Sequence, residues 1–321
     1  MLEVNHISFA YDSKKVITNI SFSIPKGQHV AVIGESGCGK STLLKLIYGL
    51  YDLDEGSIAY HGKPVLGPKF NLVPGMDFMK YLAQDFDLMP FITVAENIGK
   101  YLSNAYKDRK TARINELLDM VEMTEFAQTK AKYLSGGQQQ RVAIAMILAP
   151  EPEVLLLDEP FSQIDAFRRN NLRRNLFQYL KEKEITCIVA THDSTDILGF
   201  ADQAVVMRNG EMIRKENPKR LYEHPDDFYT ASLFGEVNEI PLHLIRPEKD
   251  KRKMALLYPH QLQIVSKSSL KVKIKKSFFK GDGYLVEAAF ENQKIFFESP
   301  DFPESGTEIF LSEKTNPNAT G

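Results

Sequence analysis

The 321-residue sequence has no long apolar run, no excess of charge of one sign and only two cysteines. Its longest clearly apolar stretch covers residues 142–149, far fewer than the roughly 20 residues that a membrane-spanning helix needs. The N-terminal residues alternate like a strand and lack the basic start and apolar segment of a secretory signal. We therefore expect a soluble chain, and any membrane role would come through a partner.

Charge and cysteine content exclude further classes of protein. Forty Lys and Arg face 42 Asp and Glu, so the net charge of −2 gives no support to a nucleic-acid-binding protein. Cys38 and Cys187 lie in different local contexts and suggest no disulfide framework, as in a reducing cytosol. An apolar content of 43% is typical of a globular chain, and the length predicts about two domains.

The first two thirds of the sequence alternate between strand and helix patterns. The predicted strands are residues 4–10, 21–24, 29–33, 154–157 and 185–190, followed by a hairpin over 204–213. Helical spacing predominates after residue 40, over 94–146 (including 111–121), and from the 154–157 strand to about 184. Strands that alternate with helices predict an α/β fold with a mainly parallel sheet.

The pattern changes near residue 235. Short alternating runs at 272–274, 284–289 and 294–297 predict a small all-β domain over 236–321, joined by a polar stretch around 236–253. Residues 251–280 contain nine Lys or Arg and no acid. Alternating lysines are typical of a solvated strand face or a protected sheet edge, and a nucleic-acid surface is the less favoured alternative.

Residues 34–41, Gly-Glu-Ser-Gly-Cys-Gly-Lys-Ser, match the phosphate-loop pattern between a predicted strand and a predicted helix. Its glycines let backbone N–H groups face phosphates, and the helix adds its positive end. Lys40 can reach the β- and γ-phosphates, and the Ser41 hydroxyl can ligate Mg²⁺. The predicted nucleotide contacts here are Gly34, Glu35, Ser36, Gly37, Cys38, Gly39, Lys40, Ser41 and Thr42, with Cys38 at a variable position.

Two acids end the apolar strand at 154–157. Carboxylates at the C-terminal end of such a strand face the crevice where α/β sheets bind ligands. Asp158 is then the expected Mg²⁺ partner, and Glu159 is the expected acceptor of a proton from the attacking water. The alternative is that the two acids only cap the next helix, and the phosphate loop favours the catalytic interpretation.

A third motif, Leu-Ser-Gly-Gly-Gln at residues 134–138, lies between the other two. It resembles the signature of the ABC ATPase family. Ser135 opens a helix whose N-terminus can bind a γ-phosphate, and Gly136 and Gly137 allow close backbone approach. The resemblance adds Gln138 to the nucleotide-binding residues. It implies an α/β P-loop ATPase of the ABC type over residues 1–235, with a helical subdomain at about 85–150.

The family resemblance implies roles for three further residues. Tyr11 matches the aromatic residue that stacks on adenine. Gln84 resembles the switch glutamine that touches Mg²⁺ or water and senses the transmembrane partner. His192, in Ala-Thr-His-Asp after the strand at 185–190, resembles the switch histidine that contacts the γ-phosphate. The catalytic set implied by the resemblance is therefore Glu159, His192 and Lys40.

Members of this family work as head-to-tail dimers, in which the signature of one copy covers ATP held by the other. The segment at residues 162–165, the dimer-contact loop, departs from the usual small-Ala-Leu-Asp pattern at Gln163 and Ile164 but keeps Asp165 as the expected dimer contact. Met146 stands where many relatives carry Arg, a change expected to affect packing or a surface pairing.

The resemblance of the last part of the chain is to the small OB-like regulatory domain behind the ATPase of bacterial importers. The expected function is the ATP-hydrolysing subunit of an importer, with ferric iron or a polyamine as the suggested solute. The resemblance implies ATP and Mg²⁺ as cofactors. It implies a second copy, permease subunits and an exported binding protein as partners, and a peripheral position on the cytoplasmic face of the membrane. A soluble mechanical ATPase acting on nucleic acid or ribosomes and a nucleotide-responsive regulator remain alternatives.

Overall fold

The chain folds into two compact units. The computed structural model describes residues 1–83, 85–246 and 252–314. The first unit comprises residues 1–219 and the second residues 220–321, so the boundary expected at residue 235 lies inside the second unit. Each unit has a hydrophobic core of its own.

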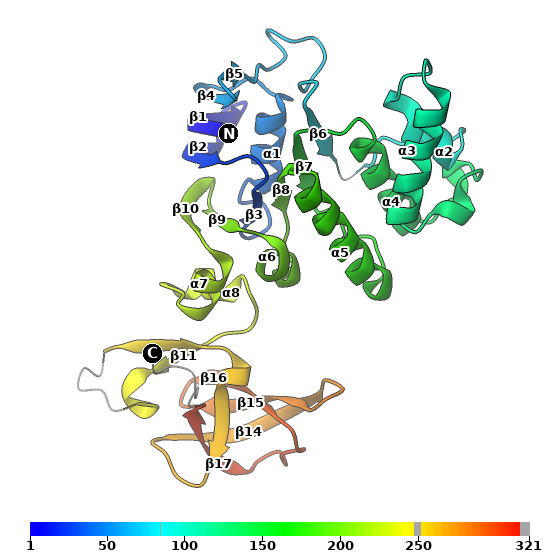
Figure 1. Cartoon of the computed structure of the whole chain (residues 1–321). Helices are drawn as coiled ribbons and strands as arrows, with labels where there is room; N and C mark the ends of the chain where they lie inside the picture. The colour runs from blue at the N-terminus through cyan, green and yellow to red at the C-terminus, as the bar shows by residue number, and fades with distance from the viewer. Residues whose placement is uncertain (84, 247–251, 315–321) are drawn as a thin grey trace. The chain divides into compact units, whose positions relative to one another are not determined.

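A six-stranded sheet forms the centre of the first unit (Figure 1). In sheet order its strands are β10 (Glu211–Glu216), β9 (Gln203–Arg208), β3 (His29–Ile33), β8 (Thr186–Ala190), β7 (Val154–Asp158) and β6 (Met79–Leu82). All neighbouring pairs are parallel except β9 and β10, which form the predicted hairpin. Strands β3, β7 and β8 are buried along their whole length, which explains their apolar sequences. The predicted α/β sheet is thereby confirmed.

A second, antiparallel sheet has the order β2-β1-β4-β5. Its strands are β1 (Leu2–Tyr11), β2 (Lys14–Ile24), β4 (Glu55–Tyr60) and β5 (Lys63–Pro64). The predicted strand at 21–24 is only the end of β2. His6 and Asn19 have φ values of 48° and 49°, and the β1–β2 register shifts beside them. These irregularities interrupt the alternation of apolar and polar residues by which a strand is recognised, so the first part of β2 was not predicted.

Helix α1 (Lys40–Tyr48) contacts strands of both sheets, including β2 and β7. Its buried residues, Leu43, Leu44, Leu46 and Ile47 among them, share one core with both sheets. Helices α5 (Ala166–Glu182) and α6 (Ser194–Phe200) follow β7 and β8 in the chain. The phosphate loop thus follows β3, Asp158 and Glu159 stand at the end of β7, and His192 follows β8, whereas the signature lies between β6 and β7.

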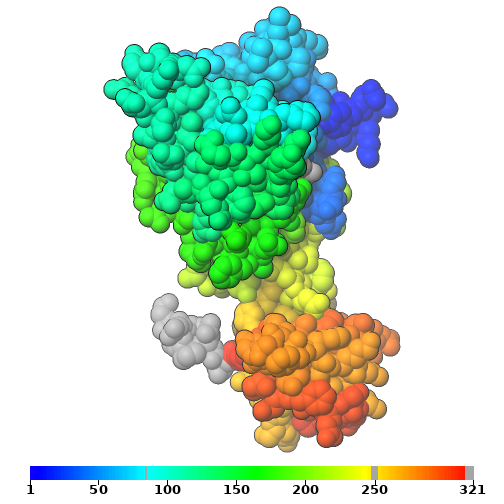
Figure 2. Space-filling view, turned by 90° about the vertical axis from the view of Figure 1, so that its right-hand side faces the viewer, coloured from blue at the N-terminus to red at the C-terminus, as the bar shows by residue number. Residues whose placement is uncertain are grey.

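The segment between β6 and β7 is helical, as predicted. It contains α2 (Val94–Ile98), α3 (Lys107–Met120) and α4 (Gly136–Leu148), and these helices pack on one another. In the space-filling view this region, cyan to green, covers much of the face of the first unit turned to the viewer (Figure 2). Met146 is 2% exposed and lies in the part of α4, from Gln140 to Leu148, that is buried on all sides, so its difference from the family pattern affects packing.

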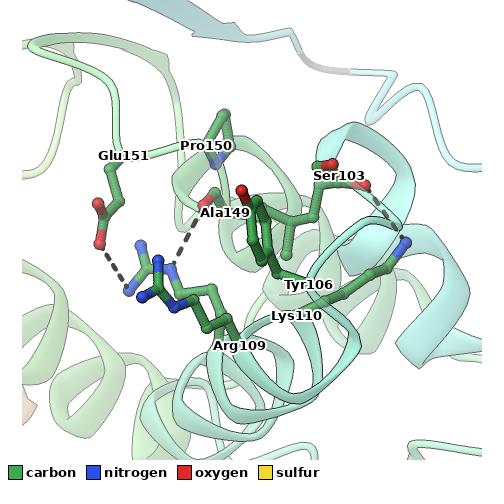
Figure 3. A pocket seen from close by; sticks show the side chains of 9 residues that line it. Ser103, Tyr106, Arg109, Lys110, Ala149, Pro150 and Glu151 are labelled. Carbon is green, nitrogen blue, oxygen red and sulfur yellow. Dashed lines mark hydrogen bonds and ion pairs between the residues drawn. The ribbon is translucent and has the colours of Figure 1, made fainter.

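Arg113 anchors α3 to the end of α4. Its Nη2 donates to the carbonyl of Leu148 at 2.7 Å and to the hydroxyl of Tyr179 at 2.7 Å, while Nε donates to Ala149 O at 3.3 Å. Arg113 Nη1 also forms ion pairs with Glu116 at 2.8 Å and Glu151 at 3.8 Å, and the Arg113 side chain is only 10% exposed. This arginine borders a surface pocket of about 370 Å³ between α3 and the residues that follow α4 (Figure 3).

The second unit is mostly β-structure. Two short helices, α7 (Pro218–Glu223) and α8 (Phe228–Ser232), lead to the paired strands β11 (Asn238–Pro241) and β12 (Met254–Leu257). The expected polar linker at 236–253 is therefore partly strand. A five-stranded antiparallel sheet follows in the order β13 (Leu262–Val265), β17 (Glu308–Glu313), β14 (Leu270–Phe279), β15 (Tyr284–Phe290) and β16 (Gln293–Ser299). The predicted all-β character is confirmed.

Part of the basic run at 251–280 lies on β14, where lysines face the solvent. Lys271, Lys273 and Lys275 are exposed and alternate with buried Val272 and Ile274. Lys271 also pairs with Glu308 on the neighbouring strand at 2.5 Å. The solvated-face interpretation accounts for this pattern. In the part of the chain that the structure describes, no helix is long and apolar enough to cross a membrane.

Candidate functional site

The phosphate-loop sequence connects β3 to α1 and needs glycine at two positions for steric reasons. A Cβ atom on Gly34 would lie 2.3 Å from the carbonyl oxygen of Met207. Gly39 has φ 108° and occupies the N-cap of α1. Cys38 is buried beside Gly34, and burial raises the pKa of its thiol, so it remains a neutral packing residue.

The loop presents its polar residues around a central lysine. Lys40 Nζ donates to Gly34 O at 2.7 Å and to Glu35 O at 3.0 Å. Glu35, Ser36 and Gly37 are exposed, whereas Thr42 is buried in the first turn of α1. The ammonium group is therefore held at the loop that the sequence assigns to phosphates.

Asp158, the last residue of β7, faces the start of α1. Ser41 Oγ donates to Asp158 Oδ1 at 3.0 Å, and the Tyr81 hydroxyl donates to Asp158 Oδ2 at 3.3 Å. Burial raises the pKa of Tyr81, and the charge of Asp158 adds to the shift, so the phenol stays protonated and donates. The sequence predicted the proximity of Ser41 and Asp158 but missed Tyr81. This residue lies on β6, the strand that pairs with β7.

Glu159 and His192 form the second close pair. His192 Nδ1 lies 2.9 Å from Glu159 Oε1 and 2.8 Å from Oε2. Glu159 has φ 50°, and its N–H donates to Ala190 O at 2.9 Å, which ties the residue after β7 to the end of β8. The His192 side chain is 74% exposed and that of Glu159 19%. The imidazole is thus accessible, while the carboxylate sits deeper at the edge of the sheet.

The signature residues open α4 in a different place. Ser135 is the N-cap, and its side chain accepts from Gln138 N–H while the Gln138 side chain accepts from Ser135 N–H. This capping box fixes the start of the helix. A Cβ atom on Gly137 would lie 2.7 Å from Gln163 O, and one on Gly136 would lie 2.5 Å from Gln163 Oε1. The signature therefore packs against the dimer-contact loop of its own chain.

The dimer-contact loop itself leads directly into α5. Asp165 is exposed and occupies the N-cap of that helix, but its side chain accepts no capping hydrogen bond. Ile164 is 3% exposed, so one of the two departures from the usual pattern adds apolar packing. Asp165 is thus available to a partner, as its predicted role requires.

Tyr11 ends β1 inside a cluster of aromatic rings. Its ring is 38% exposed and meets Phe9 and Tyr51 edge-on, with centroid distances of 4.8 and 5.4 Å. Aromatic neighbours at these distances hold the ring in place, and Tyr11 stays partly exposed. Gln84, the expected switch glutamine, lies outside the described residues.

The structure therefore groups the expected residues into several clusters. Lys40, Ser41 and Asp158 lie together, and Glu159 lies with His192. A cavity of about 780 Å³ includes Ser41, Tyr81 and Asp158 in its lining. The signature glycines lie against Gln163 instead, apart from the phosphate loop. Sequence reasoning missed Gln140, whose side chain bonds both Glu159 O and Gln163 N at 3.0 Å.

Comparison with known proteins gives the family. Residues 17–162 match the family described as ABC transporter. The chain is 40% identical over 248 residues to the Fe(3+) ions import ATP-binding protein FbpC 1 of Rhodococcus jostii, covering 76% of this chain and 70% of that protein. It is 36% identical over 251 residues to the spermidine/putrescine import ATP-binding protein PotA of Thermotoga maritima, covering 78% of this chain and 67% of that protein.

The fold agrees with this assignment. A solved dimeric ATP-binding cassette in a post-hydrolysis state, bound to ADP and Pi, aligns with a TM-score of 0.61 and 28% identity. The alignment covers 68% of this chain and 99% of that structure. The resemblance first seen in the phosphate loop and the signature thus extends over the length of a whole cassette. This chain belongs to the ABC transporter family as an ATP-binding protein with the ABC ATPase fold.

Proposed function

We propose that this chain is the ATP-hydrolysing subunit of an importer for ferric iron or a polyamine. The observation that carries the proposal is the pairing of Glu159 with His192 next to a phosphate loop whose Ser41 bonds Asp158. The similarity to ATP-binding proteins of iron and spermidine/putrescine import supports the choice of solute.

Phosphoryl transfer to water requires positioning and charge neutralisation more than covalent chemistry. Lys40 neutralises charge on the β- and γ-phosphates, and the N-terminus of α1 adds its dipole. Glu159 accepts the proton of the attacking water. His192, exposed above that carboxylate, contacts the γ-phosphate and keeps the base oriented.

The oxygen donors near α1 fit a magnesium ion. Mg²⁺ prefers hydroxyl and carboxylate oxygens, and Ser41 Oγ and Asp158 Oδ1 lie 3.0 Å apart. Ser41, Asp158 and Gln84 are the residues that would hold it. When bound, the ion neutralises phosphate charge during transfer. Tyr81 keeps Asp158 oriented by donating to its other oxygen.

A second copy completes the nucleotide site. Two chains pack head to tail, so that Ser135, Gly136, Gly137 and Gln138 of one cover ATP on the phosphate loop of the other. Asp165 contacts the partner, and Tyr11 stacks on adenine. The exposure of Asp165 and of Tyr11 supports these roles. ATP binding then closes the dimer, and hydrolysis releases it.

In this proposal residues 236–321, within the second unit, are an OB-like regulatory domain. An OB-fold is a five-stranded, partly open barrel. The five antiparallel strands and the proximity of β13 to β16 support that assignment. The proposed functional boundary remains residue 235. The chain works on the cytoplasmic face of the membrane through permease subunits, which an exported solute-binding protein supplies with solute.

Purification from membranes tests the transport role. The tagged full chain, extracted in mild detergent with ATP, should copurify with multi-span permease subunits. The complex should then be placed in liposomes. Its ATP hydrolysis should be faster when Fe³⁺ or spermidine is supplied together with its binding protein. Copurification of ribosomes or DNA in place of permease subunits would contradict the transport role.

A further inference from the structure

Arg169, in the first turn of α5, contacts two loops at once. Its Nε and Nη2 both donate to Ile164 O, at 3.1 and 2.8 Å. Its third nitrogen, Nη1, lies 3.8 Å from Asp193 Oδ2. Asp193 follows His192 directly in the chain. One guanidinium group therefore bridges the dimer-contact loop and the loop that carries the histidine.

Asp193 is also fixed from the next turn of the same helix. Arg173 Nη2 donates to Asp193 Oδ2 at 2.6 Å, and Nε of the same side chain pairs with Asp196 Oδ1. The Arg173 side chain is 3% exposed. Burial opposes ionisation of Asp193, but hydrogen bonds from Thr195 and Arg173 outweigh it and hold its pKa below the usual range. The residue beside His192 thus remains an anion anchored to α5.

The other side of the dimer-contact loop is held by the signature helix. The Gln140 side chain donates to Glu159 O at 3.0 Å and accepts from Gln163 N–H at 3.0 Å. Gly137 leaves no space for a side chain beside Gln163 O. The contacts therefore run from α4 through the dimer-contact loop and Arg169 to Asp193. The peptide chain joins Asp193 to His192, which lies beside Glu159 and so closes the ring.

We propose that this ring is a relay in which Arg169 is a positioning residue that transmits movement of the dimer-contact loop to the His192–Glu159 pair. The inference rests on the proposed function, in which the signature helix closes over ATP held by the second copy. The relay then makes hydrolysis at one composite site depend on the nucleotide at the other. The planar fork of arginine reaches both partners, whereas a lysine ammonium is a single point charge and reaches one.

Steady-state ATP hydrolysis by the full chain tests the relay. The variants are Arg169→Ala and Arg169→Lys, with Arg168→Ala as the matched control because Arg168 is an exposed neighbour of the same type. The wild type should show a Hill coefficient for ATP between 1 and 2, as two coupled sites allow. Both Arg169 variants should bring it to about 1 and lower kcat roughly 2- to 30-fold, with the nucleotide Kd unchanged. The control should match the wild type.

Each other result has a defined meaning. Wild-type cooperativity and kcat in Arg169→Ala would overturn the relay, and so would full rescue by Arg169→Lys, because charge alone would then suffice. A wild type with a Hill coefficient of 1 also overturns it, whereas a folded wild type that hydrolyses no ATP overturns the proposed function itself. If Arg169→Ala loses its circular dichroism signal, Gln140→Ala serves as the second test of the relay. This substitution releases the opposite side of the dimer-contact loop and should also abolish cooperativity, and wild-type cooperativity in it would overturn the relay.

Discussion

Acid should weaken the first unit through His29, at the start of β3. The ring is 1% exposed and lies 5.6 Å from the ring of Phe177. Burial, together with the charge of Lys181, lowers the pKa of His29 to about 4, against the attraction of Asp202. The unfolded chain has an ordinary histidine with a pKa near 6.5, so it binds the proton more readily.

The sign and size of the effect follow from these two pKa values. Stability is fully present above the unfolded pKa and is lost as the pH falls from about 6.5 towards 4, because the unfolded state takes up the proton first. Between pH 7 and pH 5 the loss is about 2 kcal/mol, and by pH 4 it reaches about 3 kcal/mol.

Urea unfolding monitored by circular dichroism at 222 nm measures this loss, because the long helices belong to the first unit. His29→Leu removes the titrating group, so the free energy of unfolding should fall by about 2 kcal/mol less between pH 7 and pH 5 than it does in the wild type. His61→Gln, at an exposed histidine, should leave the dependence as in the wild type. An equal pH dependence in His29→Leu and the wild type would refute the reasoning.

Three further changes test separate parts of the structure. Arg113→Ala removes bonds to two carbonyls and a phenol and should lower stability by about 3 kcal/mol in urea titrations. Arg109→Ala, at an exposed arginine of the same pocket (Figure 3), should change it little. Tyr11→Ala should raise the Kd for a fluorescent ATP analogue roughly tenfold while Tyr11→Phe retains affinity, and equal Kd values would exclude stacking. Gly34→Ala should abolish nucleotide binding because its Cβ meets Met207 O at 2.3 Å, whereas Gly199→Ala has open space and should bind normally.

The sequence was sufficient for features in which neighbouring residues carry the signal. The phosphate loop, the acids after β7 and the signature are short motifs, and the apolar strands β3, β7 and β8 are continuous runs. Their order along the chain predicted a parallel sheet and the approach of Ser41 to Asp158, since strand ends meet at one edge.

Other contacts depend on register and helix rotation, which local patterns do not contain. Tyr81 reaches Asp158 only because β6 pairs with β7. The sequence of β6, Met-Lys-Tyr-Leu, neither alternates nor forms an apolar run, so it gives no strand signal. In the sequence, Arg169 and Gln140 are polar helix residues without a motif of their own. Only the orientation of α5 and α4 about their axes brings these side chains to the dimer-contact loop. Bulges near His6 and Asn19 hid most of β2 in the same way.

The central claim is that Glu159 is the base of an ATP-hydrolysing dimer, and one variant tests it most directly. Glu159→Gln keeps the size of the side chain and its place beside His192 but cannot accept a proton. The account predicts that the purified variant binds ATP and elutes as a stable dimer in size-exclusion chromatography. Its kcat should fall about 10²- to 10⁴-fold. Hydrolysis near the wild-type rate would contradict the account.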